Sequence, residues 1–381
     1  MTGLLRLAST YLSLPLLFAC AAAWLTYDMP AGYMEGIGLL SLAALLVMAL
    51  DLITGPRLPQ GIRLAGEYAG TREAFVALAF CALVGVFCVL DLALFSVPLW
   101  DKPSAYADMD GGREHIRHIS AWCWVFPPVA LLCVRRRWVR HAMVLAGILF
   151  PILVIDRNRI FASLFAMGLV LVMRREPGRR LPWLVVALLA VAGMCLFAVL
   201  GILRSGPLEG VTLPFGPVYL ASPPGIRWLL LYVSAGPYNF ASILAKHYGN
   251  ADFLLNQVVP LRGSIATAGT NIPLDSPTIN VGTEFFPFLM AMGPAGAFAS
   301  IIALYGVLVW SVRRVRASAS LFSLLIFLRM AYVAAMAPFA PQAFTFMSAA
   351  FIALCLSMQW FAACLPNRLA ASLLSDTPMS P

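Results

Sequence analysis

Long apolar segments recur from one end of the chain to the other, and they restrict the possible folds more than any other feature. Most are roughly 15 to 25 residues long, the length that a helix rising about 1.5 Å per residue needs to cross a hydrocarbon core about 30 Å thick. No run shows the apolar/polar alternation of β-barrel strands. Hydrophobic residues make up 61% of the 381 residues and charged residues 11%, which excludes an ordinary soluble domain. The sequence predicts an all-α polytopic membrane protein.

About ten transmembrane helices are expected. The first apolar run is expected to be retained, because no small-x-small cleavage site follows it. The predicted spans are 8–26, 37–54, 73–97, 118–134, 142–156, 160–173, 181–203, 284–312, 321–340 and 342–364. They divide the chain into an N-terminal bundle at 1–203, one large polar, Gly/Pro-rich loop at 204–283, C-terminal helices at 284–364 and a tail at 365–381.

The basic residues predict an orientation. With the N-terminus inside, 16 of the 26 Lys and Arg residues fall in cytoplasmic connections, as the positive-inside rule requires. Both termini are then cytoplasmic and the large loop is external. This pattern also explains the net charge of +9, so nucleic-acid binding is not needed to account for it. The eight cysteines lie in or beside apolar spans and indicate packing residues rather than disulfides or a metal site.

The segment from Ile226 to Ala245 is long and apolar enough to be an eleventh span. Crossing the bilayer there would place the basic run from Arg313 to Arg316 on the external side, against the positive-inside rule. Gly236 and Pro237 also disfavour a continuous helix. We therefore expect two short helices that lie on the membrane or re-enter it.

Ten basic residues are left outside the cytoplasmic connections, and some of them are candidate functional groups. Arg157 and Arg159 follow Asp156 between two short apolar segments, so this turn is expected below the external surface. Arg329 lies inside a predicted span. Charged groups at membrane depth need an anionic partner or ligand, and they indicate a functional site unless they are paired structurally or snorkel to the surface. The other members of the ten are Lys102, Arg113, Arg117, Arg204, Arg227, Lys246 and Arg262.

Several segments resemble bacterial oligosaccharide repeat-unit polymerases, the Wzy-type O-antigen and exopolysaccharide polymerases. The run from Asn280 to Phe288, followed by Gly293 to Gly296 and by Tyr305-Gly306, is similar to the family's Asn-x-x-Thr, Pro-Phe-Tyr and Gly-x-x-Gly pattern. The helix opening at Arg159 and the run from Tyr232 to Phe240 are also similar to family segments. The resemblance covers roughly residues 150 to 310. Where family members often carry an acid before the first glycine, this chain has Ala291 and Met292.

The resemblance implies a GT-C-like architecture and a metal-independent glycosyltransferase in the bacterial inner membrane. Its substrates would be undecaprenyl-diphosphate-linked oligosaccharides, joined at the periplasmic face by transfer of the nascent glycan to a lipid-linked acceptor. Partners would include a flippase and a chain-length regulator, and no cofactor is expected. Arginine forks would hold the leaving diphosphate, and a base would assist the acceptor hydroxyl. The expected residues are Arg157, Arg159, Arg204, Arg227, Arg262 and Arg329 for diphosphate, Glu284 or His247 as base, and Tyr232, Tyr238, Asn280 and Thr283 for glycan.

Other interpretations stay open from the sequence. A lipid-linked oligosaccharide flippase would also place Arg beside phosphates, although the two halves of the chain show no internal repeat. An O-antigen ligase or another membrane glycosyltransferase shares the architecture. Asp108 and Asp110 are more typical of a turn than of a metal site, but they keep a metal-using enzyme among the alternatives. His115 and His118 are expected to be ordinary outer-loop residues.

Overall fold

Helices account for the regular secondary structure of the described residues. The computed structural model describes residues 3–59, 68–101, 110–174, 211–259 and 272–366, with isolated positions between 184 and 202. Within these ranges no strand forms, and one isolated bridge joins Tyr27 to Phe215. Within the described part of the chain, six helices are long and apolar enough to cross a membrane. The protein is therefore an all-α, multi-pass membrane protein. The expected number of ten spans is not confirmed, and the span predicted at 181–203 lies largely outside the described residues.

The six candidate spans are α1 (Ala8–Thr26), α2 (Tyr33–Thr54), α3 (Arg72–Leu94), the composite Arg113–Cys133, α13 (Phe286–Ser318) and α15 (Phe346–Cys364). The composite consists of α4 (Arg113–Ser120), a 3-10 turn η4 (Ala121–Val125) and α5 (Phe126–Cys133). The other helices are α6 (Arg137–Leu153), α7 (Arg157–Met173), α9 (Pro217–Ala221), α10 (Pro224–Ala245), α11 (Ala251–Val258) and α14 (Leu321–Met336), with 3-10 turns η1 (Leu4–Arg6) and η3 (Asp110–Gly112).

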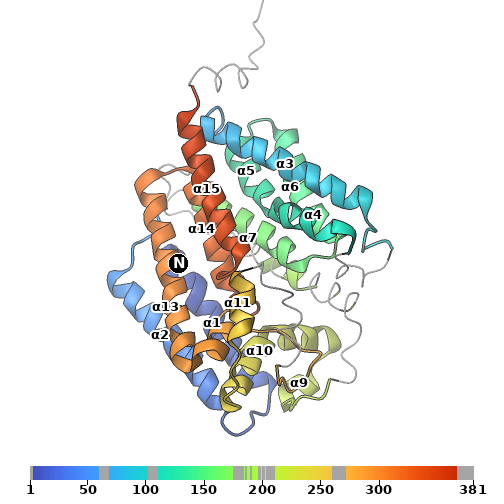
Figure 1. Ribbon diagram of the computed structural model, residues 1–381, viewed down its shortest axis with the longest axis vertical. Helices are drawn as coiled ribbons and strands as arrows, with labels where there is room; N and C mark the ends of the chain where they lie inside the picture. The colour runs from blue at the N-terminus through green and yellow to red at the C-terminus, as the bar shows by residue number, and fades with distance from the viewer. Residues whose placement is uncertain are drawn as a thin grey trace, which may run out of the picture.

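The helices form two groups on either side of α14. In Figure 1, α3 to α6 lie together on one side, and α1, α2 and α13 lie on the other. Helix α14 contacts α1 and α13 of one group and α3 of the other, it also contacts α7, and almost all of its side chains are buried. A helix that is apolar all round and enclosed by neighbours belongs to the centre of a bundle. The exceptions on α14 are Arg329 and Ala335, which are partly exposed.

Polar contacts tie the helix ends together at one end of the bundle, here called the Asp51 end. Asp51 of α2 is fully buried and accepts hydrogen bonds from the backbone N–H of Ser9 at 2.8 Å and the hydroxyl of Tyr305 at 2.9 Å. Glu73, at the start of α3, accepts one from the hydroxyl of Ser320 at 2.6 Å, just before α14. These are the helix ends that the basic residues predict to be cytoplasmic.

The opposite end is here called the Glu284 end. Glu284 precedes α13 and accepts a hydrogen bond from the backbone N–H of Ala343 at 2.7 Å, in the segment that leads into α15. Tyr332, near the end of α14, donates its hydroxyl to the backbone carbonyl of Asn158 in the first turn of α7 at 2.7 Å. The helices thus alternate in direction between the two ends. Which end faces the cytoplasm stays a prediction.

Helix α10 corrects one expectation, because it is continuous across Gly236 and Pro237 from Pro224 to Ala245. Its second half is almost wholly buried, and that packing outweighs the hydrogen bond that Pro237 cannot donate. Gly236 is required there, since a Cβ at this position would collide with the backbone carbonyl of Pro338.

The chain around α10 enters and leaves at the same end of the bundle. Before the helix, the backbone N–H of Gly216 donates to Thr26 O at 2.9 Å, at the end of α1. After it, Ala245 lies 3.6 Å from the Cβ position of Gly32, at the start of α2. Because Thr26 and Gly32 flank one short turn, the segment from 216 to 245 returns to the end from which it started.

The composite span replaces the single helix predicted at 118–134, and it begins five residues earlier, at Arg113. Pro127 and Pro128 have no N–H to donate toward the preceding turn, so a regular α-helix cannot run through them. The chain adopts the tighter 3-10 turn η4 just before them. This change of pitch is important for the site because Trp122 and Trp124 lie in η4.

Candidate substrate-binding site

Three arginine side chains meet in one cavity of about 420 Å³ at the Glu284 end of the bundle, here called the arginine cavity. Arg117 comes from α4, Arg159 from α7 and Arg329 from α14. Helices distant in sequence therefore supply one basic lining. The other lining residues are Glu114, His118, Ala121, Trp122, Trp124, Asp156, Asn158, Ala162 and Met347.

The first turn of α7 fixes Arg159. Asp156 is the N-cap of this helix, and its carboxylate accepts the backbone N–H of Arg159 at 3.2 Å, as a helix start requires. The same carboxylate forms an ion pair with the Arg159 guanidinium at 2.7 Å. Arg159 also donates to the hydroxyl of Ser120 and to the carbonyl of Arg117, each at 3.4 Å. The guanidinium is thus held between Asp156 and the C-terminal end of α4.

A buried carboxylate in α3 fixes Arg117 from behind. Asp91 has no exposed side-chain surface, and it lies 3.1 Å from Arg113 Nε and 3.4 Å from Arg117 Nε. Both arginine side chains are at least 95% buried. Arg113 also donates to the carbonyl of Ser96 at 2.9 Å. One buried carboxylate therefore lies beside two guanidiniums and holds Arg117 in place at the wall of the cavity.

The rest of the arginine cavity combines aromatic rings with fixed polar groups. Trp122 and Trp124 lie 6.1 Å and 5.2 Å from the ring of Phe351, centroid to centroid. Arg329 donates to the hydroxyl of Ser348 at 3.4 Å. Indole rings beside guanidiniums suit a ligand that carries both an anion and a sugar ring, since such rings stack on apolar sugar faces while arginine forks bind phosphate oxygens.

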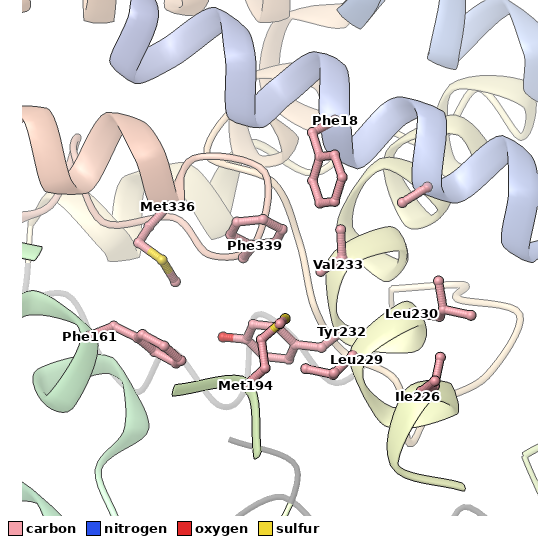
Figure 2. A pocket seen from close by; sticks show the side chains of 11 residues that line it. Phe18, Phe161, Met194, Ile226, Leu229, Leu230, Tyr232, Val233, Met336 and Phe339 are labelled. Carbon is pink, nitrogen blue, oxygen red and sulfur yellow. The ribbon is translucent and has the colours of Figure 1, made fainter. Parts of the chain in front are cut away.

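A second cavity of about 370 Å³ is lined by apolar side chains and the ring of Tyr232, and is here called the apolar cavity. Figure 2 shows Phe18 of α1, Phe161 of α7, Met336 of α14 and residues of α10 converging on it. Phe161 faces this cavity, whereas the next residue, Ala162, faces the arginine cavity. The first turns of α7 therefore divide the two spaces.

Arg157 stands at the border of the apolar cavity. Its guanidinium lies over the ring of Tyr232, 5.6 Å from the centroid, and Tyr232 lines the cavity. The ring of Phe339 stacks on Tyr232 at 5.9 Å. Of the residues expected to bind diphosphate, Arg157 thus contacts a lining residue of the apolar cavity, and Arg159 and Arg329 share the arginine cavity.

Glu284 is fully buried, and its carboxylate holds the segment that leads into α15. Oε2 accepts the backbone N–H groups of Gln342 and Ala343, and Oε1 accepts that of Phe344 at 3.0 Å. Burial raises the pKa of Glu284 to about 7, against the opposite effect of these three donors and of Arg329. The expected base is thus enclosed in backbone contacts and is not a lining residue of either cavity.

Tyr238, expected to contact glycan, belongs instead to a polar cluster around Asp275. Its buried hydroxyl donates to Asp275 Oδ2 at 2.7 Å, as Tyr33 does at 2.8 Å, and Lys246 Nζ lies 2.5 Å from Oδ1. Burial raises the pKa of Asp275, but the hydrogen bonds from Lys246, Tyr238 and Tyr33 outweigh it and hold this pKa below its ordinary value. The cluster fastens the end of the large loop to α10 and α2.

The remaining expected residues lie outside both cavities or outside the described residues. Arg227 donates to the carbonyls of Ser222 and Leu220 at the end of α9, and it lies over Tyr219. His247 is exposed with φ of 50° at the end of α10. Thr283 is buried and Asn280 is exposed. Arg204 and Arg262 lie outside the described residues, as does Asp108.

The sequence reasoning did not assign Arg117, Trp122 or Trp124 to the site, and one signal was available for Arg117. Asp91 is an acid inside a predicted span, and such an acid requires a basic partner. Arg113 and Arg117, spaced four residues apart on a helix, were among the basic residues that the orientation did not explain. The two tryptophans gave no comparable signal.

Among the residues that the structure describes, no three His, Cys, Asp or Glu side chains lie close enough together to hold a metal ion. Comparison with known proteins adds no assignment. The chain matches no protein-family model, no curated protein and no solved structure.

Proposed function

We propose that the protein is a membrane glycosyltransferase that extends lipid-diphosphate-linked oligosaccharides. The observation that carries the proposal is the meeting of Arg117, Arg159 and Arg329 in one aromatic-lined cavity. A leaving diphosphate gains negative charge as its bond to the sugar breaks. Preorganised guanidiniums stabilise that charge most strongly when they are shielded from water, as Arg117 and Arg159 are here.

The neighbouring apolar cavity supports a lipid-linked substrate over a soluble sugar nucleotide. Its lining offers aliphatic and aromatic contacts to a polyprenyl chain, and Phe18 and Ile226 at its border are themselves exposed. The two cavities share the first turns of α7, so a polyprenyl chain in one would place its diphosphate near Arg157 and Arg159. We therefore take undecaprenyl-diphosphate-linked repeat units, polymerised at the external face of the bacterial inner membrane, as the proposed substrates.

The proposal is tested with the purified full-length protein in nanodiscs and a synthetic undecaprenyl-diphosphate-linked repeat unit. Wild type should convert the substrate to longer lipid-linked products, read by gel and mass spectrometry. Arg159→Ala and Arg329→Ala should each lower the rate by a factor of ~10² or more, because each removes a group aimed at the leaving charge. Arg159→Lys should recover little of the rate lost in Arg159→Ala, since a point charge does not replace a bidentate guanidinium.

Arg316→Ala is the matched control. Arg316 is exposed in the last turn of α13, at the Asp51 end, so its loss removes the same charge far from both cavities. If the wild-type protein binds the substrate without lengthening it, the proposed polymerase activity is refuted. A lipid-linked oligosaccharide transporter would then be the alternative. Transfer to a lipid A core acceptor instead would indicate a ligase, and transfer that stops with a chelator would indicate the metal-using alternative.

A further inference from the structure

The arginine cavity contains a histidine and a glutamate that its anion-binding role does not use. His118 and Glu114 lie one turn apart on α4, and both line the cavity. His118 Nε2 is 3.5 Å from Glu114 Oε1, and their side chains are 50% and 60% exposed. An imidazole with one nitrogen directed at a carboxylate has its other nitrogen available to accept a proton.

Helix α4 is held firmly although this part of it is exposed. Arg113 and Arg117 of α4 are paired with buried Asp91 of α3. At the end of α4, Arg159 of α7 donates to the carbonyl of Arg117 and the hydroxyl of Ser120. Because Arg117 directly precedes His118, the imidazole is carried on a backbone that two other helices fix. A proton acceptor needs such a fixed position to act on a bound substrate.

We propose that His118, oriented by Glu114, is the proton acceptor in the glycosyl transfer. The proposal rests on the function proposed above and adds a catalytic residue to it. The acceptor hydroxyl oxygen forms a bond to the anomeric carbon, and the bond from that carbon to the diphosphate oxygen breaks. The electron pair of the broken bond leaves with the lipid diphosphate, which the arginines hold. The hydroxyl proton passes to His118 and from there to water, which its half-exposed side chain reaches.

The charges that face His118 have both signs. Glu114 and Arg117 come from its own helix, Asp156 and Arg159 from α7, and Arg329 from α14, while Asp91 of α3 pairs with Arg117 outside the cavity lining. The carboxylate nearest to His118 is Glu114, and it stabilises the imidazolium that forms when the proton arrives. The competing explanation is an ordinary solvated helix pair, which contributes only about 0.3–0.5 kcal/mol to stability and has no effect on the rate of transfer.

The test measures single-turnover transfer as a function of pH for the wild type, His118→Gln, Glu114→Gln and His115→Gln. His115 is the matched control, since it is exposed on the same helix but does not line the cavity. His118→Gln should lower the rate about 10²- to 10⁴-fold, the usual contribution of a positioned proton acceptor, with unchanged affinity for the lipid diphosphate. It should also change the shape of the pH–rate profile, and Glu114→Gln should change that profile as well.

The outcomes separate the two proposals. If the wild type transfers glycan and His118→Gln keeps a rate within threefold and the same pH–rate profile, the assignment of His118 is wrong and the proposed function stands. An equal loss in His115→Gln would also overturn the assignment. A folded wild type that shows no transfer refutes the proposed function itself, and the role of His118 with it. Circular dichroism of each variant confirms that the exposed substitutions leave the fold intact.

Discussion

Glu284→Ala tests whether Glu284 stabilises the junction between α13, α14 and α15. The substitution removes the acceptor for three backbone N–H groups, those of Gln342, Ala343 and Phe344. A buried donor without a partner costs about 1–3 kcal/mol, so the loss is on the order of 3 kcal/mol or more. That is a large part of a net stability of about 5–15 kcal/mol. At about 2 °C per kcal/mol for a large domain, Tm should fall by at least about 6 °C.

Glu284→Gln is the matched variant, and it separates a structural role from catalysis. Its amide oxygen can accept the two donors that Oε2 accepts, so at most the N–H of Phe344 loses its partner. We expect Tm close to that of the wild type and substantial transfer activity. Thermal unfolding in detergent, followed by circular dichroism, and the nanodisc assay measure both. Wild-type Tm for Glu284→Ala would refute the structural argument. A stable but inactive Glu284→Gln would restore Glu284 as the base.

The pH dependence of Glu284 provides an independent check. Its pKa in the folded protein is raised from an ordinary value of 4.5 to about 7, so the folded state binds this proton more tightly than the unfolded chain does. The contribution of this group to the free energy of unfolding is therefore fully present below about pH 4.5. It falls by about 3 kcal/mol as the pH rises toward 7. In Glu284→Gln this dependence should be absent. A wild-type melting temperature that rises with pH over that range, relative to Glu284→Gln, would contradict it.

Three further predictions concern packing and buried charge. Gly236→Ala should destabilise by about 1–3 kcal/mol, because its Cβ meets the carbonyl of Pro338, whereas Gly225→Ala on the same helix has open space and should leave Tm unchanged. Asp91→Asn should cost about 3–5 kcal/mol in chemical unfolding, since it removes the buried carboxylate that pairs with two buried guanidiniums. Asp275 has a lowered pKa, so its contribution to stability is present above about pH 4 and lost below it. Asp275→Asn should lack this loss in acid melting curves.

The sequence predicts those features of the fold that depend on local composition. Hydropathy located α1, α2 and α3 within a few residues, because a helix surrounded by lipid must be apolar over its whole length. Features that depend on contacts between helices distant in the sequence could not be predicted in this way. The proline in α10 indicated a break, but the enclosure of the second half of that helix keeps it continuous. Local signals cannot report such enclosure, since it arises from helices far away in the sequence.

The same distinction applies to the candidate site. Arg159 and Arg329 attracted attention because their depth is unusual for a charge, and depth can be estimated from hydropathy. Glu284 was expected to be a base from its place at a helix start, yet its role depends on three backbone groups about 60 residues away, as the separations of 58 to 60 positions show. Arg117 was missed because its partner, Asp91, belongs to another helix.

The lengths of α6 and α7 connect the fold to the depth at which the substrate would bind. Each has 17 residues and so reaches roughly 25 Å, less than a hydrocarbon core of about 30 Å. Their connection is a tight turn in which Ile155 has φ of 53°. If α6 begins and α7 ends at one membrane surface, this turn lies several ångströms below the other, near the depth at which a lipid diphosphate would meet its polyprenyl chain. The turn leads directly into Arg157 and Arg159, so short helices would place these guanidiniums where the proposed substrate would carry its charge.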